Sequence, residues 1–331
     1  MAREPALAPG RYTVTARLAG ERLDRALQIL RPGVSRTRLQ EWVRDGGIRV
    51  DGVVVDRPAF RLEAGTTLEL VVVPRSRLRP GGPSGAVLAV IYEDEHLAVI
   101  DKPPGMVTHP SALVGGATVS ELAEARWGSL PVAQGEDRPG IVHRLDAGTS
   151  GLLVLARRAG PAEELVRQFR SREVEKTYLA IVFGEPRFDS DWIDAPIGRA
   201  GGAGDRLAVV PAGEGLPAET FYRTLHRARG FGVLACQPRT GRTHQIRVHL
   251  ASIDHPLVGD PLYRGRRGLS RALPAGAPPL ERQALHAAEL RFRHPATGES
   301  LAFRSPVPAD LAAWLRWLGA SPLLLASSTA E

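Results

Sequence analysis

Cysteine is almost absent from this chain: Cys236 is the only one among 331 residues. A single cysteine excludes an intramolecular disulfide framework and any zinc site built from several thiolates. Cys236 lies in the apolar run 231–236, which predicts that it fills the core rather than acting as a reactive thiol. The zinc-protease pattern His-Glu-x-x-His is also missing, and the i, i+5 spacing of His244 and His249 does not place two ligands on one helical face. The sequence therefore predicts no metal site.

Long apolar runs are missing as well. None approaches the ~18 consecutive apolar residues that a membrane-spanning helix needs, so no membrane partner is expected. The N-terminal stretch has no apolar core of the signal-peptide kind, and we therefore expect a cytoplasmic protein. A chain with 43% apolar and 24% charged residues is typical of globular proteins, and 331 residues are enough for two domains.

Acidic residues are fewer than basic ones, 36 against 43, which gives a formal net charge of +7. A positive net charge suits a polyanionic partner. The excess is uneven, because residues 11–77 contain 13 arginines against 8 acids. A run of like charges is often only a solvated surface, and this alternative stays open for the basic segment.

The basic segment has its own pattern of elements. Apolar residues at i, i+3, i+4 and i+7 predict a helix over 23–30, and Ser35 suits the N-cap of a second helix. Asp51-Gly52 predicts a hairpin turn, and 68–73 predicts another strand. The outer face of the second helix is basic, with Arg36, Arg38 and Arg44.

Residues 11–77 resemble an S4 RNA-binding domain. The resemblance rests on Arg22-Leu23-Asp24, on Ser35-Arg36 and on the turn at 47–52. It implies that the basic helix face contacts RNA phosphates, which give affinity without reading sequence.

Residues 78–86 contain Arg-Pro-Gly-Gly-Pro-Ser-Gly and predict a linker, and 321–331 predict a frayed tail. Between them, 87–320 mix strand and helix patterns at hairpin-length spacings. This mixture predicts an α+β fold with a mixed, largely antiparallel sheet. Strands are expected over 87–92, 97–100, 151–156, 177–183, 220–226 and 231–237, and helices over 120–126, 161–170 and 244–253.

The segment His-Arg-Leu-Asp-Ala-Gly-Thr-Ser-Gly (143–151) places one acid, Asp146, in a short glycine-rich turn before an apolar strand. Such a turn can hold a carboxylate rigidly beside a cation, which a nucleophile or general base requires. An ordinary surface turn is the alternative on spacing alone. A hydrolase that pairs Ser150 with His143 is disfavoured, because the Gly-x-Ser-x-Gly elbow is missing.

The same nine residues resemble the catalytic motif of the RluA/RluD family of RNA pseudouridine synthases. Other segments are similar to that family in the same order, and together they cover roughly residues 87 to 310. They are 92–110 with Lys-Pro-Pro-Gly and His-Pro, Lys-Thr-Tyr-Leu-Ala at 176–180, Gly-Arg-Thr-His-Gln-Ile-Arg-Val-His at 241–249, and Leu-His-Ala at 285–287 with a later His-Pro at 294–295.

The resemblance implies a reaction that breaks the N1–C1′ bond of a uridine in RNA and rejoins the base through C5, with no cofactor. Asp146 would be the essential carboxylate, and whether it attacks covalently or removes a sugar proton stays open. Burial disfavours a charged carboxylate, so a cation must lie close to it. Arg247 matches the family's basic motif, with Arg242 as the alternative.

Further roles follow from the same resemblance. Tyr178 would stack on the target base or transfer a proton, and Leu285 would pack against that base. Arg144 would enter the RNA stack in place of the extruded nucleotide. His143 would order the turn, while Lys102 and His109 would shape the rim of the site.

A rival interpretation is a non-catalytic RNA-binding protein of ribosome assembly. It predicts that the catalytic residues have been replaced by others, whereas the acid, the tyrosine and both candidate arginines are present together. Family members with this N-terminal domain resemble the branch that modifies large-subunit (23S) ribosomal RNA. We therefore expect ribosomal RNA as substrate, transfer RNA as second choice, and a monomeric enzyme.

Overall fold

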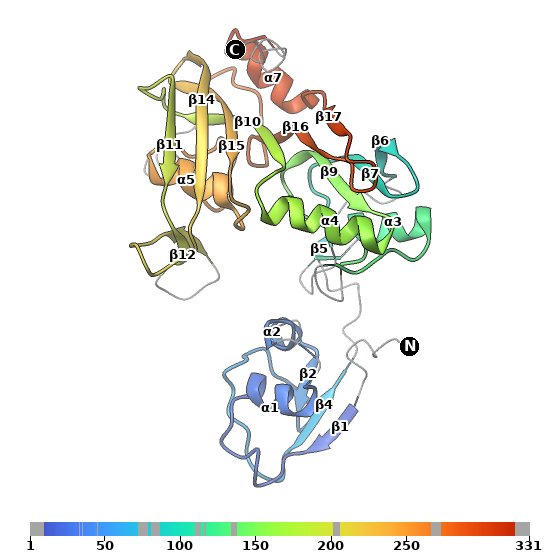
Figure 1. Ribbon diagram of the computed structural model, residues 1–331. Coiled ribbons are helices and arrows are strands. Elements are labelled where there is room, and N and C mark those ends of the chain that lie inside the picture. Colours follow the sequence, from blue (N-terminus) through green and yellow to red (C-terminus); the bar gives the residue numbers. More distant parts are fainter. Residues whose placement is uncertain are drawn as a thin grey trace. The chain divides into compact units, whose positions relative to one another are not determined.

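The computed structural model describes residues 10–321 except 33, 35, 45, 72–78, 81–86, 110–113, 116, 134–137, 201–205 and 266–272. It forms two compact units (Figure 1): Met1–Ser84 with Pro110–Gly116, and Gly85–His109 with Ala117–Glu331. Apart from 79–80 and Ser321, the predicted linker 78–86 and tail 321–331 lie outside the described residues. Within the described residues, no helix is long and apolar enough to cross a membrane.

The first unit contains two helices and an antiparallel sheet in the order β1-β4-β2-β3. The apolar faces of both helices are buried against this sheet. Asp51 and Gly52 have φ angles of 48° and 80°, which the two-residue hairpin requires, so the predicted turn is confirmed. The elements are β1 (Gly10–Thr13), α1 (Leu23–Leu30), α2 (Arg36–Arg44), β2 (Ile48–Val50), β3 (Val53–Val54) and β4 (Thr67–Leu70), with β5 (Arg79–Pro80) paired to β8 (Val114–Gly115).

The second unit is built on a nine-stranded sheet in the order β11-β14-β15-β10-β16-β9-β7-β6, with β17 beside β16. All its pairs are antiparallel except β16 with β9, which confirms the predicted mixed, largely antiparallel sheet. The strands are β6 (Ala89–Glu93), β7 (Leu97–Lys102), β9 (Ser150–Ala156), β10 (Glu175–Phe183), β11 (Ser190–Asp194), β14 (Glu219–Ala228), β15 (Phe231–Pro238), β16 (Leu285–Arg293) and β17 (Ser300–Arg304), and β12 (Ile197–Arg199) pairs with β13 (Leu207–Val209).

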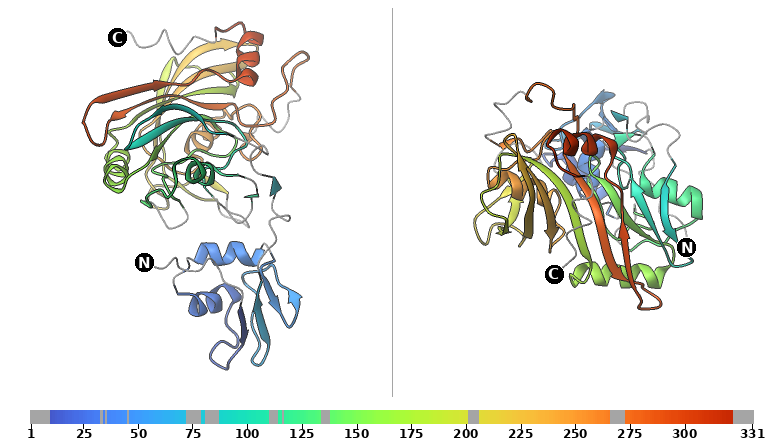
Figure 2. Two further views of the ribbon diagram at one scale, coloured as in Figure 1. Left: turned by 90° about the vertical axis from the view of Figure 1, so that its right-hand side faces the viewer. Right: turned by 90° about the horizontal axis from the view of Figure 1, so that it is seen from above.

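The helices named below, all within the described residues, pack around the large sheet (Figure 2). Alternate residues of β10 enter different clusters, because neighbouring side chains of a strand point to opposite faces. Leu179 and Ile181 pack with the last helix, whereas Ala180 and Val182 pack with Ile246 of the helix after β15. Cys236 is fully buried in the latter cluster, as predicted. The helices are α3 (Val119–Trp127), α4 (Ala159–Arg170), α5 (Gln245–Ser252) and α7 (Ala309–Trp317).

The motif at 143–151 leads into the middle of the sheet, where β10, β16 and β9 are neighbours (Figure 1). Gly151 pairs with Ala287 of β16, and Ala287 in turn pairs with Tyr178 of β10. Gly151 has φ +108°, and a Cβ at this position would lie 2.2 Å from the Ala287 carbonyl oxygen. Only glycine therefore permits this close pairing, which brings three distant segments of the chain to one place.

Candidate active site

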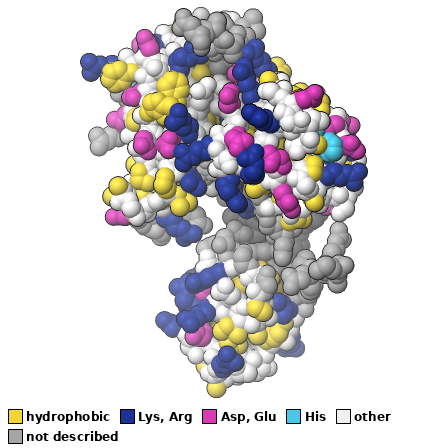
Figure 3. All heavy atoms as spheres, viewed as in Figure 1, with side chains coloured by type: hydrophobic (Ala, Val, Ile, Leu, Met, Phe, Trp, Pro, Cys, Tyr) yellow, Lys and Arg dark blue, Asp and Glu magenta, His cyan; other side chains and the backbone are white. Residues whose placement is uncertain are grey.

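A cavity of about 440 Å³ opens in the second unit, and its charge is unbalanced. Among the described lining residues Asp146 is the only acid, against eight lysines and arginines. Figure 3 shows Lys and Arg side chains gathered over the region of β10 and α4. Such a cavity attracts a polyanion. The eight cations are Arg138, Arg144, Arg170, Arg172, Lys176, Arg239, Arg242 and Arg247.

The turn that carries Asp146 is held from its N-terminal side. His143 stacks on Phe169 at a centroid distance of 4.4 Å, and its Nε2 accepts the Val154 N–H at 3.0 Å. Burial lowers the pKa of His143 to about 3, so the ring is neutral and can accept this bond. Thr108 Oγ1 donates to the Leu145 carbonyl at 2.8 Å. His143 thus makes the turn-ordering contact that its predicted role requires.

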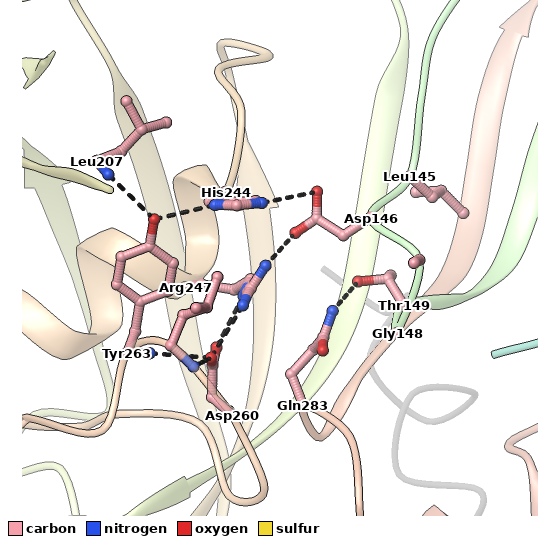
Figure 4. A network of polar contacts seen from close by, with 12 residues as sticks. Leu145, Asp146, Gly148, Thr149, Leu207, His244, Arg247, Asp260, Tyr263 and Gln283 are labelled. Carbon is pink, nitrogen blue, oxygen red and sulfur yellow. Dashed lines mark hydrogen bonds and ion pairs between the residues drawn. The ribbon is translucent and has the colours of Figure 1, made fainter. Parts of the chain in front are cut away.

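The other side of the turn is held by the segment before β16. Arg282 Nη1 donates to the Gly148 carbonyl at 3.0 Å. Gln283 Nε2 donates to Thr149 Oγ1 at 3.3 Å (Figure 4). A Cβ at Gly148 would lie 2.3 Å from Gln283 Oε1, so the turn and this segment approach as closely as glycine allows. The backbone around Asp146 is therefore fixed before any ligand binds.

Lys102 lies beneath the turn, and its predicted place on the rim is wrong. Its side chain is fully buried, and Nζ donates to the carbonyls of Pro103, Met106 and Ala147 at 2.9, 2.9 and 3.1 Å. Burial lowers the pKa of Lys102 to about 7, while the charge of Asp146 acts in the opposite direction. Three carbonyl acceptors match the three donors of an ammonium, so Lys102 ties two loops together. His109 does line the cavity, as predicted.

Replacing Lys102 by methionine should lower the free energy of unfolding by several kcal/mol. The variant keeps the buried length of the side chain but removes the donor to the Pro103 and Met106 carbonyls, while Ala147 still accepts the Gly105 N–H at 2.8 Å. An unpaired buried acceptor costs about 1–3 kcal/mol. Urea unfolding followed by circular dichroism measures the change. The matched control is Lys176→Met, at the chain's only other lysine, which lines the cavity. If the Lys102→Met variant were as stable as the native protein, the hydrogen bonds of Lys102 would not stabilise the fold.

Arg247 is the cation that contacts Asp146. Its Nη1 donates to Asp146 Oδ2 at 2.9 Å, while Nε and Nη2 donate to the two oxygens of Asp260 at 2.8 and 2.9 Å (Figure 4). The side chains of Arg247 and Asp260 are 4% and 0% exposed. Burial lowers the pKa of Arg247, but its bonds to Asp260 and the charge of Asp146 outweigh burial and raise it. Asp260 thus fixes the guanidinium that faces Asp146.

Arg242, the alternative cation, also lines the cavity. Its Nε donates to the Pro217 carbonyl at 3.0 Å rather than to Asp146. Of the two candidates, the geometry favours Arg247 as the partner of the carboxylate.

The other oxygen of Asp146 faces an imidazole. His244 Nε2 lies 3.9 Å from Asp146 Oδ1, and its Nδ1 lies 2.9 Å from the Tyr263 hydroxyl (Figure 4). The Tyr263 ring also lies 5.0 Å from the guanidinium carbon of Arg247. The backbone N–H groups of Leu262 and Tyr263 donate to Asp260 at 2.8 and 3.0 Å. Two chains of contacts therefore meet at Asp146.

His244, Asp260 and Tyr263 were not predicted as site residues. His244 lies within segment 241–249, which resembles the family, but the sequence gives it no role beyond the disfavoured metal pair with His249. The structure separates the two rings, because His249 bonds to Thr220 and to the Ala195 carbonyl. Asp260 and Tyr263 lie in a stretch without helix or strand pattern, where only a three-dimensional contact reveals them.

Tyr178 and Leu285 form an apolar wall of the same cavity. Burial and the nearby charge of Asp146 raise the pKa of Tyr178 above its usual range, so its hydroxyl keeps its proton at neutral pH. Leu285 is 4% exposed at the start of β16. Arg144 also lines the cavity, and its side chain is exposed. A flat base against this wall would lie beside the carboxylate.

Arg36, one of the candidate RNA-binding arginines of the first unit, pairs with a buried acid. Arg36 Nε and Nη2 donate to Asp24 Oδ2 at 3.1 and 2.9 Å, and Arg22 also bonds to Asp24. Burial alone would raise the pKa of Asp24, but the bonds from Arg22, Gln40 and Arg36 lower it to about 2. Arg36 remains 51% exposed. The side chains of Arg38 and Arg44 lie outside the described part of the structure.

Comparison with protein families gives two matches. Residues 96–252 match the RNA pseudouridylate synthase model, and residues 21–68 match the S4 domain model. A protein of Xanthomonas campestris named ribosomal large subunit pseudouridine synthase D is 41% identical over 88% of this chain and 87% of its own length. The protein of the same name from Pseudomonas aeruginosa is 41% identical over 90% of this chain and 92% of its own length.

Solved structures give a consistent comparison. Human RNA pseudouridylate synthase domain containing 1 aligns with a TM-score of 0.55 at 26% identity, over 70% of this chain and 89% of that structure. Human RNA pseudouridylate synthase domain containing 4 aligns with the same TM-score at 27% identity, over 70% of this chain and 93% of that structure.

Proposed function

This chain belongs to the RNA pseudouridylate synthase family, and we propose that it converts specific uridines of large-subunit (23S) ribosomal RNA to pseudouridine. The observation that carries the proposal is a single carboxylate, Asp146, held by Arg247 in an otherwise basic cavity. The ribosomal substrate is supported by relatives of that name, which are similar over about nine-tenths of the chain. Transfer RNA is the second candidate.

The proposed reaction moves the ribose from N1 to C5 of the base. The N1–C1′ bond breaks, a C5–C1′ bond forms, C5 loses a proton and N1 gains one, so no oxidant or reductant is required. Asp146 would act as nucleophile or as base, with the Arg247 guanidinium bonded to one of its oxygens. Tyr178 and Leu285 would hold the face of the base, and Arg144 would take the place of the extruded nucleotide.

We further propose that residues 11–77 bind RNA, that 78–86 link this domain to a catalytic domain at 87–320, and that 321–331 are a tail. We also propose that the enzyme acts as a monomer. A ribosomal substrate supports a cytoplasmic location.

Pseudouridine mapping tests the function. Unmodified 23S ribosomal RNA, ribosomal subunits and transfer RNA are incubated with the protein, treated with carbodiimide, and read by primer extension. New stops in 23S RNA are the expected result. Stops found only in transfer RNA would show that transfer RNA, not 23S RNA, is the substrate. Tight binding without stops in any of the three would favour the non-catalytic assembly protein.

Deleting residues 1–80 should weaken RNA binding and flatten its salt dependence. Each phosphate contact adds about 0.7–0.9 to the slope of log K against log salt, so loss of several contacts lowers the slope by their sum. Filter binding from 50 to 300 mM salt measures the slope. The single-turnover rate at saturating protein serves as the control for the catalytic domain. An unchanged slope would show that the first unit does not bind phosphates.

A further inference from the structure

His244 and Asp146 lie on either side of a gap that is too wide for a direct hydrogen bond but lets one hydroxyl group bind to both from the side. The 3.9 Å between His244 Nε2 and Asp146 Oδ1 is too long for a hydrogen bond, which spans about 2.7–3.2 Å. Among the described residues, neither atom has a hydrogen-bond partner, although Arg247 holds the other oxygen of Asp146. An oxygen atom about 2 Å to one side of the line between them can lie about 2.8 Å from both.

Tyr263 offers His244 a hydroxyl group that favours the tautomer with its proton on Nε2. The Tyr263 oxygen accepts the Leu207 N–H at 3.4 Å, and the Tyr263 hydroxyl can donate its own proton to His244 Nδ1, which lies 2.9 Å away. The imidazole proton then lies on Nε2, toward the gap. Burial lowers the pKa of His244, which keeps the ring neutral although the charge of Asp146 opposes this. The gap therefore has a donor on one side and an acceptor on the other, which a hydroxyl group complements.

The ring is held before substrate arrives. His244 has φ 56° at the start of α5, where Gln245 Oε1 accepts the Arg242 N–H at 3.0 Å. The Tyr263 ring meets His244 edge-on at a centroid distance of 5.6 Å. A donor fixed in this way loses little entropy when it binds a ligand.

We propose that His244 Nε2 and Asp146 Oδ1 together hold the 2′-hydroxyl of the target ribose, and that Tyr263 is a positioning residue for His244. This inference rests on the proposed function. With the base against Tyr178 and Leu285 and the ribose at Asp146, the hydroxyl next to C1′ is the one on C2′. The contact distinguishes RNA from DNA and fixes the sugar against the carboxylate.

The test compares two short RNAs that differ only in the 2′ position of the uridine located by mapping, ribose in one and 2′-deoxyribose in the other. Single-turnover rates are measured for the native protein, His244→Ala and His244→Gln. We expect the native protein to lose about 10²- to 10³-fold on the deoxy substrate. His244→Ala should lose about 10- to 100-fold on the ribose substrate alone, which shrinks the ribose-to-deoxy ratio at least tenfold. His244→Gln, whose amide nitrogen reaches near the Nε2 position, should recover part of that ratio.

Two more variants separate positioning from folding. Tyr263→Phe keeps the ring beside Arg247 and removes the hydroxyl, so it should shrink the ratio in the same direction by a smaller factor. His96→Gln, beside Glu95 and away from the cavity lining, should leave the ratio unchanged. The same ratio in the native protein and His244→Ala would overturn the inference while leaving the function intact. No product from the native protein on any ribose RNA would overturn the function itself.

Discussion

Asp146→Asn should lower the single-turnover rate of pseudouridine formation by about 10⁴-fold or more. Asparagine has nearly the same shape and still offers Arg247 an oxygen, but it can neither attack a sugar nor accept its proton. Affinity for the RNA should be retained or slightly increased, because the variant removes the only acid among eight cations of the described cavity lining. Carbodiimide mapping measures the product, and filter binding measures affinity.

Asp254→Asn is a suitable control for this experiment. Asp254 is exposed, and its φ of 59° suits asparagine as well as aspartate, so this substitution changes one charge without straining the backbone. It should leave the rate unchanged. Substantial product from the Asp146→Asn variant would show that the reaction does not require the Asp146 carboxylate.

The first unit shows what sequence patterning can predict. Helical spacing and the Asp51-Gly52 turn are local signals, and both elements formed as expected. In the second unit, β16 was missed because its first half is buried on both faces between β10 and β9. A strand in that position shows no alternation of apolar and polar residues. A strand that is buried on both faces therefore cannot be recognised from the alternation of apolar and polar residues in a single sequence.

In the candidate site too, the sequence predicts some residues and misses the contacts between them. Asp146, Tyr178 and Arg247 came from segments that resemble a known family, and the structure brings them to one cavity. The hydrogen bond between Arg247 and Asp146 joins positions that are 101 residues apart, and no local sequence pattern predicts it. Lys102 was misplaced because lysine usually lies at the surface. Only the three carbonyls around Nζ make its buried position possible.

Arg36 illustrates a different limit. A basic helix face predicts free cations, yet Arg36 shares the buried carboxylate of Asp24 with Arg22. One edge of each guanidinium is thus used within the fold, while both side chains remain about half exposed. Charge counting cannot reveal this pairing, because an acid at the surface and an acid in the core contribute equally to net charge.

Arg247→Met should reduce the rate of isomerisation by about 10³-fold and lower the free energy of unfolding by about 3–5 kcal/mol. The substitution leaves Asp146 and the fully buried Asp260 without the guanidinium that bonds to both. Removing one partner of a buried ion pair costs more than the pair contributes, since the remaining charge stays desolvated. Single-turnover kinetics and urea unfolding measure the two effects separately.

Arg247→Lys separates charge from geometry. Lysine restores a cation but offers one nitrogen, which cannot reproduce the three bonds that the guanidinium makes to two carboxylates. Its rate should therefore lie between those of Arg247→Met and the native protein. The matched control is Arg242→Met, in the same cavity but bonded to the Pro217 carbonyl, with an expected loss below tenfold. If Arg242→Met abolished the reaction while Arg247→Met kept more than a tenth of the rate, Arg242 would be the cation that the reaction requires beside Asp146, and the contact between Arg247 and Asp146 would serve only the fold.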